Sequence, residues 1–197
     1  MNRRVLMLML LTGLIGSFTG LDRVRAAPAS IDRSEAGSST AAASESAAIA
    51  NLREAATRGN AQAQYDLAVA LDCGRGVKRN RAQALDWLRK AADQGHVAAQ
   101  SALGWRYMTG HGVRRDDRAA FDWLRRAAER GNTSAQNNLG ILYAQGRGVA
   151  ADAVEAEKWF RLAAEKGATD AQRNLEALRA GHSGDARPSI EPTFPRT

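Results

Sequence analysis

Residues 95–130 read GHVAAQSALGWRYMTGHGVRRDDRAAFDWLRRAAER, and residues 131–166 repeat the pattern as GNTSAQNNLGILYAQGRGVAADAVEAEKWFRLAAEK. A third copy precedes them at residues 59–94. In this register a tryptophan recurs every 36 residues, at Trp87, Trp123 and Trp159, and an Ala-Ala pair follows each one. A fixed period of this length is typical of a helical hairpin that buries its apolar face only by stacking on its neighbours. The repeat predicts an all-α array with a binding surface rather than a catalytic pocket.

The first half of each block predicts a helix that ends in a glycine turn. In the middle copy Ala99, Leu103 and Tyr107 follow an i, i+4, i+8 spacing, which keeps them on one stripe. Gly104 sits beside the central leucine and allows the second helix to approach closely. The turn at residues 110–113 has two glycines, which tolerate a positive φ, and its valine is expected to pack back into the hairpin.

The second half of each block begins with a helix N-cap signal. Asn80 with Gln83, and Asp152 with Glu155, have the spacing of capping boxes, and Asp116 is the matching cap of the middle block. A glutamine also recurs once per copy, and this column is predicted to form hydrogen bonds between helices; its members are Gln64, Gln100, Gln136 and Gln172.

The ends of the chain differ from the repeats. Residues 1–26 have a basic start, an apolar run and a small-residue cleavage site, which predicts a secretory signal peptide that is cleaved or retained as an anchor. Residues 27–45, rich in Ala and Ser, predict a flexible linker, and residues 181–197 a disordered tail that holds three of the four prolines. The repeat array is assigned to residues 46–180, with a half-repeat cap at each end.

Charge and cysteine content narrow the class of partner. The net charge is +7 and falls to about +4 once residues 1–26 are removed, which argues against nucleic acid. We expect a periplasmic or secreted protein with no stable transmembrane span after cleavage. Cys73 is the only cysteine, so no internal disulfide can form, and its role stays open between an intermolecular disulfide and an unpaired small apolar side chain.

The repeat resembles a known family. The pattern A-x-x-x-L-G-x-x-Y-x-x-G-x-G-V, then Asp, then A-x-x-W-x-x-x-A-A-x-x-G, is similar to the Sel-one-like repeat family, a cousin of the tetratricopeptide repeat. The resemblance implies an αα-hairpin solenoid, a right-handed superhelix of three full 36-residue repeats, that acts as a protein-interaction adaptor. It also implies that the first helices of the blocks line the concave side. Bacterial relatives are often envelope proteins tied to exopolysaccharide export, signalling or host contact.

One candidate site is an apolar groove on that concave side. The faces opposite the core stripes carry unexpected apolar side chains, which are typical anchors for a partner peptide or helix. The alternative is that they only pack between neighbouring helices. The candidate groove residues are Tyr65, Val69, Trp105, Met108, Asn137 and Ile141, with Trp105 the leading anchor.

A second candidate is a basic edge formed by the loops after the first two glycine turns. Its residues are Arg75, Lys78, Arg79, Arg81, Arg114, Arg115 and Arg118. Such a strip suits an anionic envelope glycan or lipid, although a solvated charged edge is the ordinary alternative.

Catalysis has little support in the sequence. His96, His111 and His182 lack the spacing of metal ligands, and the Gly-x-Gly turns lack the Lys-Ser/Thr ending of a phosphate-binding loop. Some relatives have been linked to β-lactam hydrolysis, but no residue here is assignable as nucleophile or base. We therefore expect a non-enzymatic adaptor with no cofactor and no metal, and keep a β-lactamase-like hydrolase as the weakest alternative.

Overall fold

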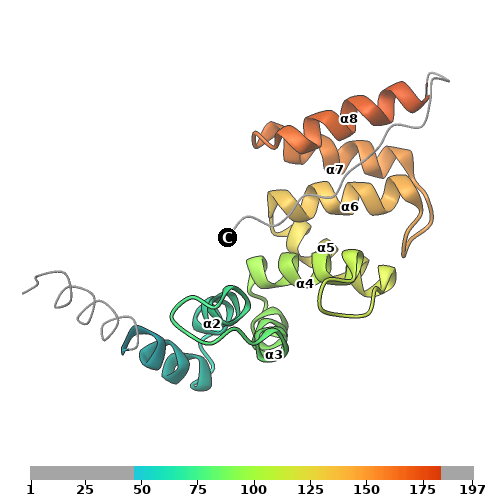
Figure 1. The fold of residues 1–197 in the computed structure, drawn as a ribbon. Helices are drawn as coiled ribbons and strands as arrows, with labels where there is room; N and C mark the ends of the chain where they lie inside the picture. Colours follow the sequence, from blue (N-terminus) through green and yellow to red (C-terminus); the bar gives the residue numbers. More distant parts are fainter. Residues whose placement is uncertain (1–46, 183–197) are drawn as a thin grey trace, which may run out of the picture.

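The computed structural model describes residues 47–182, and it shows helices joined by short turns throughout this range (Figure 1). The predicted signal peptide, the linker and the tail beyond residue 182 lie outside the described residues. A first helical segment spans residues 47–57. It is followed by α2 (Ala61–Cys73), α3 (Arg81–Asp93), α4 (Val97–Thr109), α5 (Asp117–Glu129), α6 (Thr133–Gln145), α7 (Ala153–Glu165) and α8 (Thr169–His182).

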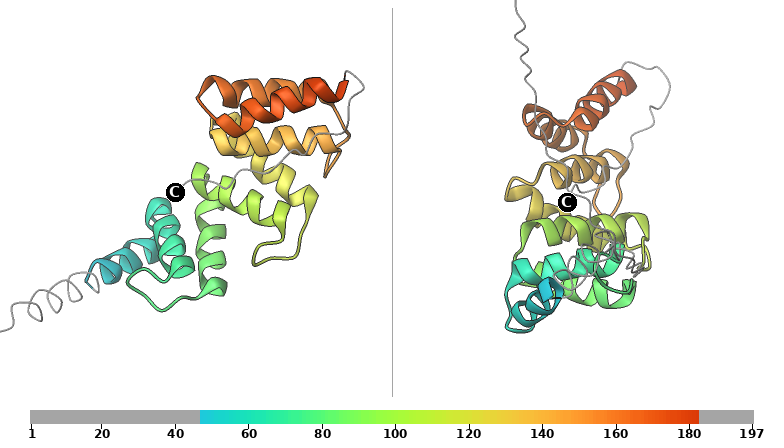
Figure 2. Two further views of the ribbon diagram at one scale, coloured as in Figure 1. Left: turned by 45° about the horizontal axis from the view of Figure 1, so that its top comes forward. Right: turned by 60° about the vertical axis from the view of Figure 1, so that its left-hand side comes forward.

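Each repeat forms one helical hairpin, and the hairpins stack in chain order. The hairpins are α2–α3, α4–α5 and α6–α7, and each helix also packs on the next one along the chain. The first helices of successive hairpins meet as well, α4 on α6 and α6 on α8. Figure 2 shows an open row of helices rather than a globular bundle. The predicted all-α hairpin array is thus confirmed.

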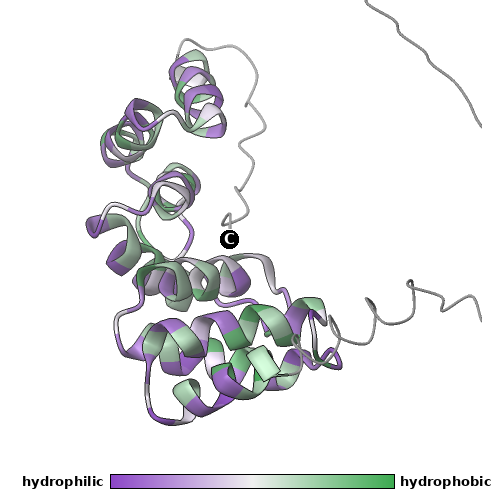
Figure 3. Ribbon diagram, turned by 90° about the vertical axis from the view of Figure 1, so that its left-hand side faces the viewer, coloured by the Kyte–Doolittle hydropathy of each residue, from purple (hydrophilic) through white to green (hydrophobic). Residues whose placement is uncertain are grey.

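The core runs along the row as a chain of small apolar clusters. The predicted stripe residues Leu67, Leu103 and Leu139 are at most 1% exposed, and the alanine one turn earlier is buried in every copy. Both helices of a hairpin contribute, so each helix carries apolar and polar residues on different sides (Figure 3). Stability is therefore built from local interfaces between neighbouring helices.

Two glycines set the distance between the helices of the second and third hairpins. A Cβ placed on Gly104 would lie 2.7 Å from Cγ of Leu124, and one on Gly140 would lie 2.7 Å from Cε1 of Phe160. These distances are too short for real carbon contacts, so the predicted close approach is confirmed. Ala68 holds the same position in the first hairpin and is buried.

The predicted N-caps are present, but the reciprocal half of the capping box is not. The side chains of Asn80, Asp116 and Asp152 accept hydrogen bonds from backbone amides of the first turn. Their own backbone amides donate to carbonyl groups of the preceding helix, as from Asn80 to Leu71 at 2.8 Å. The side chains of Gln83 and Glu155 are not needed there, because the hairpin partner already satisfies those amides.

The glutamine column forms the predicted bonds between helices in three of its four members. Gln64, Gln100 and Gln136 each donate a side-chain hydrogen bond of 3.0–3.2 Å to the carbonyl of the alanine eight residues earlier. The prediction is wrong for Gln172, whose side chain is exposed and forms no such bond within the described residues. Gln172 lies on the last helix of the described array, where no further repeat covers it.

The tryptophan column lies at the boundary between core and solvent. Trp87, Trp123 and Trp159 are half-buried and pack against the apolar clusters. A cationic side chain lies over each ring, as with Nζ of Lys90, 4.1 Å from the centroid of Trp87. This arrangement half-buries each ring and leaves the cationic side chain over it exposed to water.

Candidate functional site

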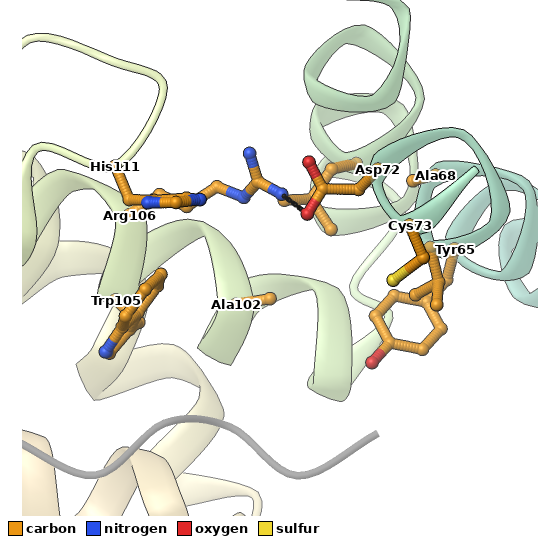
Figure 4. Close-up of a pocket in the computed structure, with 10 residues that line it drawn as sticks. Tyr65, Ala68, Asp72, Cys73, Ala102, Trp105, Arg106 and His111 are labelled. Atoms are coloured by element: carbon orange, nitrogen blue, oxygen red, sulfur yellow. Dashed lines mark ion pairs between the residues drawn. The ribbon is translucent and has the colours of Figure 1, made fainter. Parts of the chain in front are cut away.

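A mostly apolar pocket opens between α2 and α4, the first helices of the first two hairpins. We call it the α2–α4 pocket (Figure 4). Tyr65 and Val69 line it from α2, Ala102 and Trp105 from α4, and Leu88 from α3. Its polar borders are Asp72, Cys73, Arg106 and His111. Three of the six predicted groove residues, Tyr65, Val69 and Trp105, thus meet in one pocket.

A histidine lies against each of the two aromatic walls. Tyr65 stacks on His96 with ring centroids 4.8 Å apart, and Trp105 meets His111 at 5.4 Å. Burial raises the pKa of the Tyr65 hydroxyl above its usual value, so this group stays neutral near neutral pH. Two aromatic rings, those of Tyr65 and Trp105, therefore line the pocket, and each is packed against a histidine.

His96 also holds the beginning of α4. Its Nδ1 accepts a hydrogen bond from the backbone amide of Ala99 at 3.2 Å, and its Nε2 lies 2.9 Å from Oε1 of Gln62. Since Nδ1 accepts, the ring is neutral and Nε2 donates to Gln62. Burial lowers the pKa of His96, which favours this neutral form. His96 is therefore the N-cap of α4.

One edge of the pocket is an ion pair that sequence reasoning missed. Nη2 of Arg106 lies 2.9 Å from Oδ2 of Asp72, and the two side chains are 10% and 25% exposed. One further buried atom of each residue, Nη1 of Arg106 and Oδ1 of Asp72, has no hydrogen-bond partner within the described residues. The available signal was a break in the repeat, because Met108 and Leu142 hold the equivalent positions one copy later.

The other three predicted groove residues are buried, so their assignment to an open groove is wrong. Met108 is 2% exposed, Asn137 1% and Ile141 0%. Met108 and Ile141 belong to the apolar cluster between the second and third hairpins. Asn137 accepts a buried hydrogen bond of 2.9 Å from Asn174 of α8. Here the alternative applies, since these side chains pack between neighbouring helices.

The predicted basic edge divides into two groups. All seven side chains are exposed, and five form no ion pair within the described residues; these are Arg75, Lys78, Arg79, Arg81 and Arg114. Nη2 of Arg115 lies 2.8 Å from Oδ2 of Asp117, and Nε of Arg118 lies 3.6 Å from Oδ2 of Asp122. The hydrogen bond to Asp117 raises the pKa of Arg115. The uncompensated positive charge therefore lies mainly on the α2–α3 loop, with Arg114 on the α4–α5 loop.

Asp117 links two repeats rather than serving a ligand. It accepts hydrogen bonds from Arg115 and from Arg147, whose Nη2 is 2.6 Å from Oδ1 and also 2.8 Å from the carbonyl of Met108. These bonds lower the pKa of Asp117 well below its usual range, so the carboxylate stays ionised. Arg147 thereby ties the α6–α7 turn to the hairpin before it.

Neither a metal centre nor a membrane helix is found in the described part of the chain. Within residues 47–182 no group of three or more His, Cys, Asp and Glu side chains could hold a metal ion. No helix of this range has the length and apolarity to cross a bilayer. Cys73 is exposed and forms no disulfide.

Stacked αα-hairpins define a helical repeat protein. The Sel1 repeat family matches residues 61–96, 97–132 and 133–167. The chain belongs to this family, whose members are generally protein-interaction scaffolds and usually non-catalytic.

Two solved structures are similar over most of this chain. A Sel1 repeat protein from Oxalobacter formigenes is 39% identical, with a TM-score of 0.61 over 65% of this chain and 96% of that one. The second is c5321, a protective antigen of uropathogenic Escherichia coli strains with an SLR fold. It is 40% identical, with a TM-score of 0.62 over 71% of this chain and 30% of that one. No curated protein sequence matches this chain.

Proposed function

We propose that this protein is an exported, non-catalytic scaffold that binds an apolar segment of a partner protein in the α2–α4 pocket. The observation that carries the proposal is that Val69 and Trp105 remain half-buried at an open pocket, whereas Ile141, the equivalent residue of the third repeat, is fully buried. Tryptophan and tyrosine dominate interface hot spots because they bury much area with few rotatable bonds. An apolar helix or extended peptide is the class of ligand that fits such a pocket.

The test compares two tryptophans of the same repeat. A photo-crosslinking amino acid at Ala102, in the pocket wall, identifies partners in the native host, and purified partners are then titrated calorimetrically. We expect Trp105→Ala to weaken binding about 30-fold, the effect of losing a hot spot of about 2 kcal/mol. Trp123→Ala, on α5 and outside the pocket lining, is the matched control. Equal affinity of the Trp105→Ala and parent proteins would exclude this pocket.

Export is part of the proposal and has its own test. N-terminal sequencing of the protein recovered from the periplasm or medium of its native host should give Ala27 as the first residue. Recovery of the uncleaved chain in the membrane fraction would indicate an anchor instead.

A second candidate function rests on the basic edge. Four uncompensated cationic side chains on two loops, together with Arg81 at the start of α3, favour contact with an anionic envelope glycan or lipid, which would make the protein an envelope-assembly or polysaccharide-export component. Binding to phosphatidylglycerol vesicles should then fall steeply between 50 and 300 mM salt, and the triple change of Arg75, Lys78 and Arg79 to Gln should abolish it. Binding in the apolar pocket should respond little to the same salt change. A β-lactamase-like hydrolase remains without a nominated nucleophile.

A further inference from the structure

The α2–α4 pocket is an apolar surface that the helical array itself leaves unfilled. Tyr65, Val69, Leu88, Ala102 and Trp105 surround it, and no described helix lies in it. Burial of an apolar side chain in such a pocket is favourable, because it removes apolar surface from water. A segment of the same chain has an advantage over other occupants, because a tether holds it at a high effective concentration, of the order of millimolar.

The segment after α8 has the composition of such an occupant. Residues 183–197 read SGDARPSIEPTFPRT, and their large apolar side chains are Ile190 and Phe194. Pro192 and Pro195 flank Thr193 and Phe194, and proline favours the extended polyproline II conformation. Extended proline-containing segments dock on grooves lined by aromatic rings and lose little conformational entropy on binding. Glu191 is the only charged residue between Ile190 and Pro195.

We propose that the C-terminal segment 190–195 occupies the α2–α4 pocket, with Phe194 between Tyr65 and Trp105, and competes there with an external partner. This inference rests on the proposed docking function of the pocket and adds regulation to it. A partner segment would have to displace Phe194, so the apparent affinity of the full chain would be lower than that of a chain without its C-terminal segment.

The topology brings this segment to the correct end of the array. The helices α4, α6 and α8 end on the same side, where the α4–α5 and α6–α7 turns also lie (Figure 1). The pocket is formed by the later parts of α2 and α4, including Val69, Cys73 and Trp105, and by His111 in the α4–α5 turn. The chain therefore leaves α8 at His182 on the side of the row where α4 also ends, and Trp105 and His111 of the pocket lie near that end of α4.

The reach of the segment is sufficient. From α8 across α6 to α4 there are two steps between packed helices, each of about 10 Å, and the pocket lies half a step beyond α4, which gives roughly 25 Å. The twelve residues from Ser183 to Phe194 span up to roughly 40 Å when extended. The segment can therefore cross α6 and α4 and reach the pocket without any displacement of α8.

Cys73 provides the readout, because it is the only thiol of the chain and lines the pocket. We would measure the rate at which a thiol reagent labels Cys73 in the full chain, in a chain that ends after His182, and in full-length Phe194→Ala. We expect labelling of the full chain to be at least three-fold slower than that of the other two. Full-length Ser183→Ala is the matched control and should stay slow. Circular dichroism checks that all variants keep their helices.

Adding the peptide 183–197 in trans provides a second measurement. It should slow the labelling of the shortened chain, whereas the same peptide with Phe194→Ala should not, and Trp105→Ala in the shortened chain should remove the protection. Equal labelling rates in the full chain, the shortened chain and Phe194→Ala would overturn the proposal.

The two proposals fail in distinguishable ways. If partner binding to the shortened chain depends on Trp105 but Cys73 labelling never changes with the C-terminal segment, only the regulation is wrong. If the segment protects Cys73 but no partner depends on Trp105, only the docking function is wrong.

Discussion

The two interfaces that flank α4 are built from equivalent positions, yet one is open and the other is closed. Between α2 and α4, Tyr65 and the ion pair of Asp72 with Arg106 border a pocket. Between α4 and α6, the equivalents are Ser101, Met108 and Leu142, each at most 2% exposed. We call this second interface the α4–α6 seam. The backbones of α4 and α6 approach one another along it, and those of α2 and α4 show no comparable approach in the described range.

The difference shows how a repeat protein makes a site without changing its fold. A large ring at position 65 and a long charged pair hold α2 and α4 apart, whereas a serine and two flexible apolar side chains let α4 and α6 close. The α4–α6 seam buries its apolar surface and so contributes stability. The α2–α4 pocket leaves part of that surface available for a ligand. Four changes test this contrast, from the largest expected effect to the smallest.

Met108→Asp places a carboxylate in the closed α4–α6 seam without the arginine that accompanies Asp72. Since a buried charge without a partner costs about 3–5 kcal/mol, we expect the free energy of unfolding to fall by about 4 kcal/mol. Urea denaturation followed by circular dichroism measures this value. Thr109→Asp, next to it and exposed, is the control and should cost less than 1 kcal/mol. A loss below 1 kcal/mol for Met108→Asp would show that the seam is open in solution.

Gly140→Ala tests the close packing inside the hairpin beside the seam. The added methyl group would lie 2.7 Å from the ring of Phe160 and 3.2 Å from the carbonyl oxygen of Ala156, and the backbone atom cannot move without shifting α7. We expect a loss of about 2 kcal/mol, typical of an overfilled core. Thermal unfolding of this variant and of Gly104→Ala provides the measurement. An unchanged or higher melting temperature would contradict the close approach.

Two variants make the α2–α4 interface more like the α4–α6 seam. They are Arg106→Leu alone and Arg106→Leu combined with Asp72→Met. The single change leaves the partly buried Asp72 without its partner, so we expect a loss of about 2 kcal/mol. The double variant should recover most of this loss, because replacing a buried ion pair by apolar residues is often neutral. A double-mutant cycle in urea gives the coupling energy. If the double variant is less stable than the single one, the ion pair does not explain the open interface.

His96→Asn tests the cap of α4, the smallest effect of the four. The groups around His96 are Gln62, Tyr65, Asp66 and Arg130, and burial lowers its pKa below the value in the unfolded chain. The unfolded state therefore binds the proton more tightly, and this part of the stability is present above about pH 6.5 and is lost as the pH falls below it.

Asparagine caps the matching helices at Asn60 and Asn132 and does not titrate in this range. Between pH 7 and 5 we expect the parent protein to lose up to about 1 kcal/mol more than His96→Asn, the usual worth of an N-cap. Denaturant midpoints at both pH values measure it. Parallel pH curves for the two proteins would mean that His96 is not the titrating group.

The contrast between the two interfaces also separates what sequence reasoning could reach from what it could not. Three kinds of feature depend on residues close in sequence: the apolar stripes, the close helix approach at Gly104, and the caps at Asn80 and Asp116. The spacing of these residues was therefore sufficient to predict them. Val69, Trp105, Met108 and Ile141 carry the same local signal, an apolar side chain opposite the stripe. Their burial depends on residues about 36 positions away, and so half of the predicted groove was wrong.

The sequence by itself determined the hairpins, their number and their order, because a helical period and a turn are encoded within a single block. Only the tertiary structure decided which of those hairpins close on one another, that Asp72 meets Arg106, and that Arg147 reaches Asp117. The physical reason is that helix formation is governed by nearest neighbours along the chain, whereas the space between two stacked helices is set jointly by side chains from both. A single bulky or charged residue at one copy of a repeated position therefore keeps one interface open while the others close.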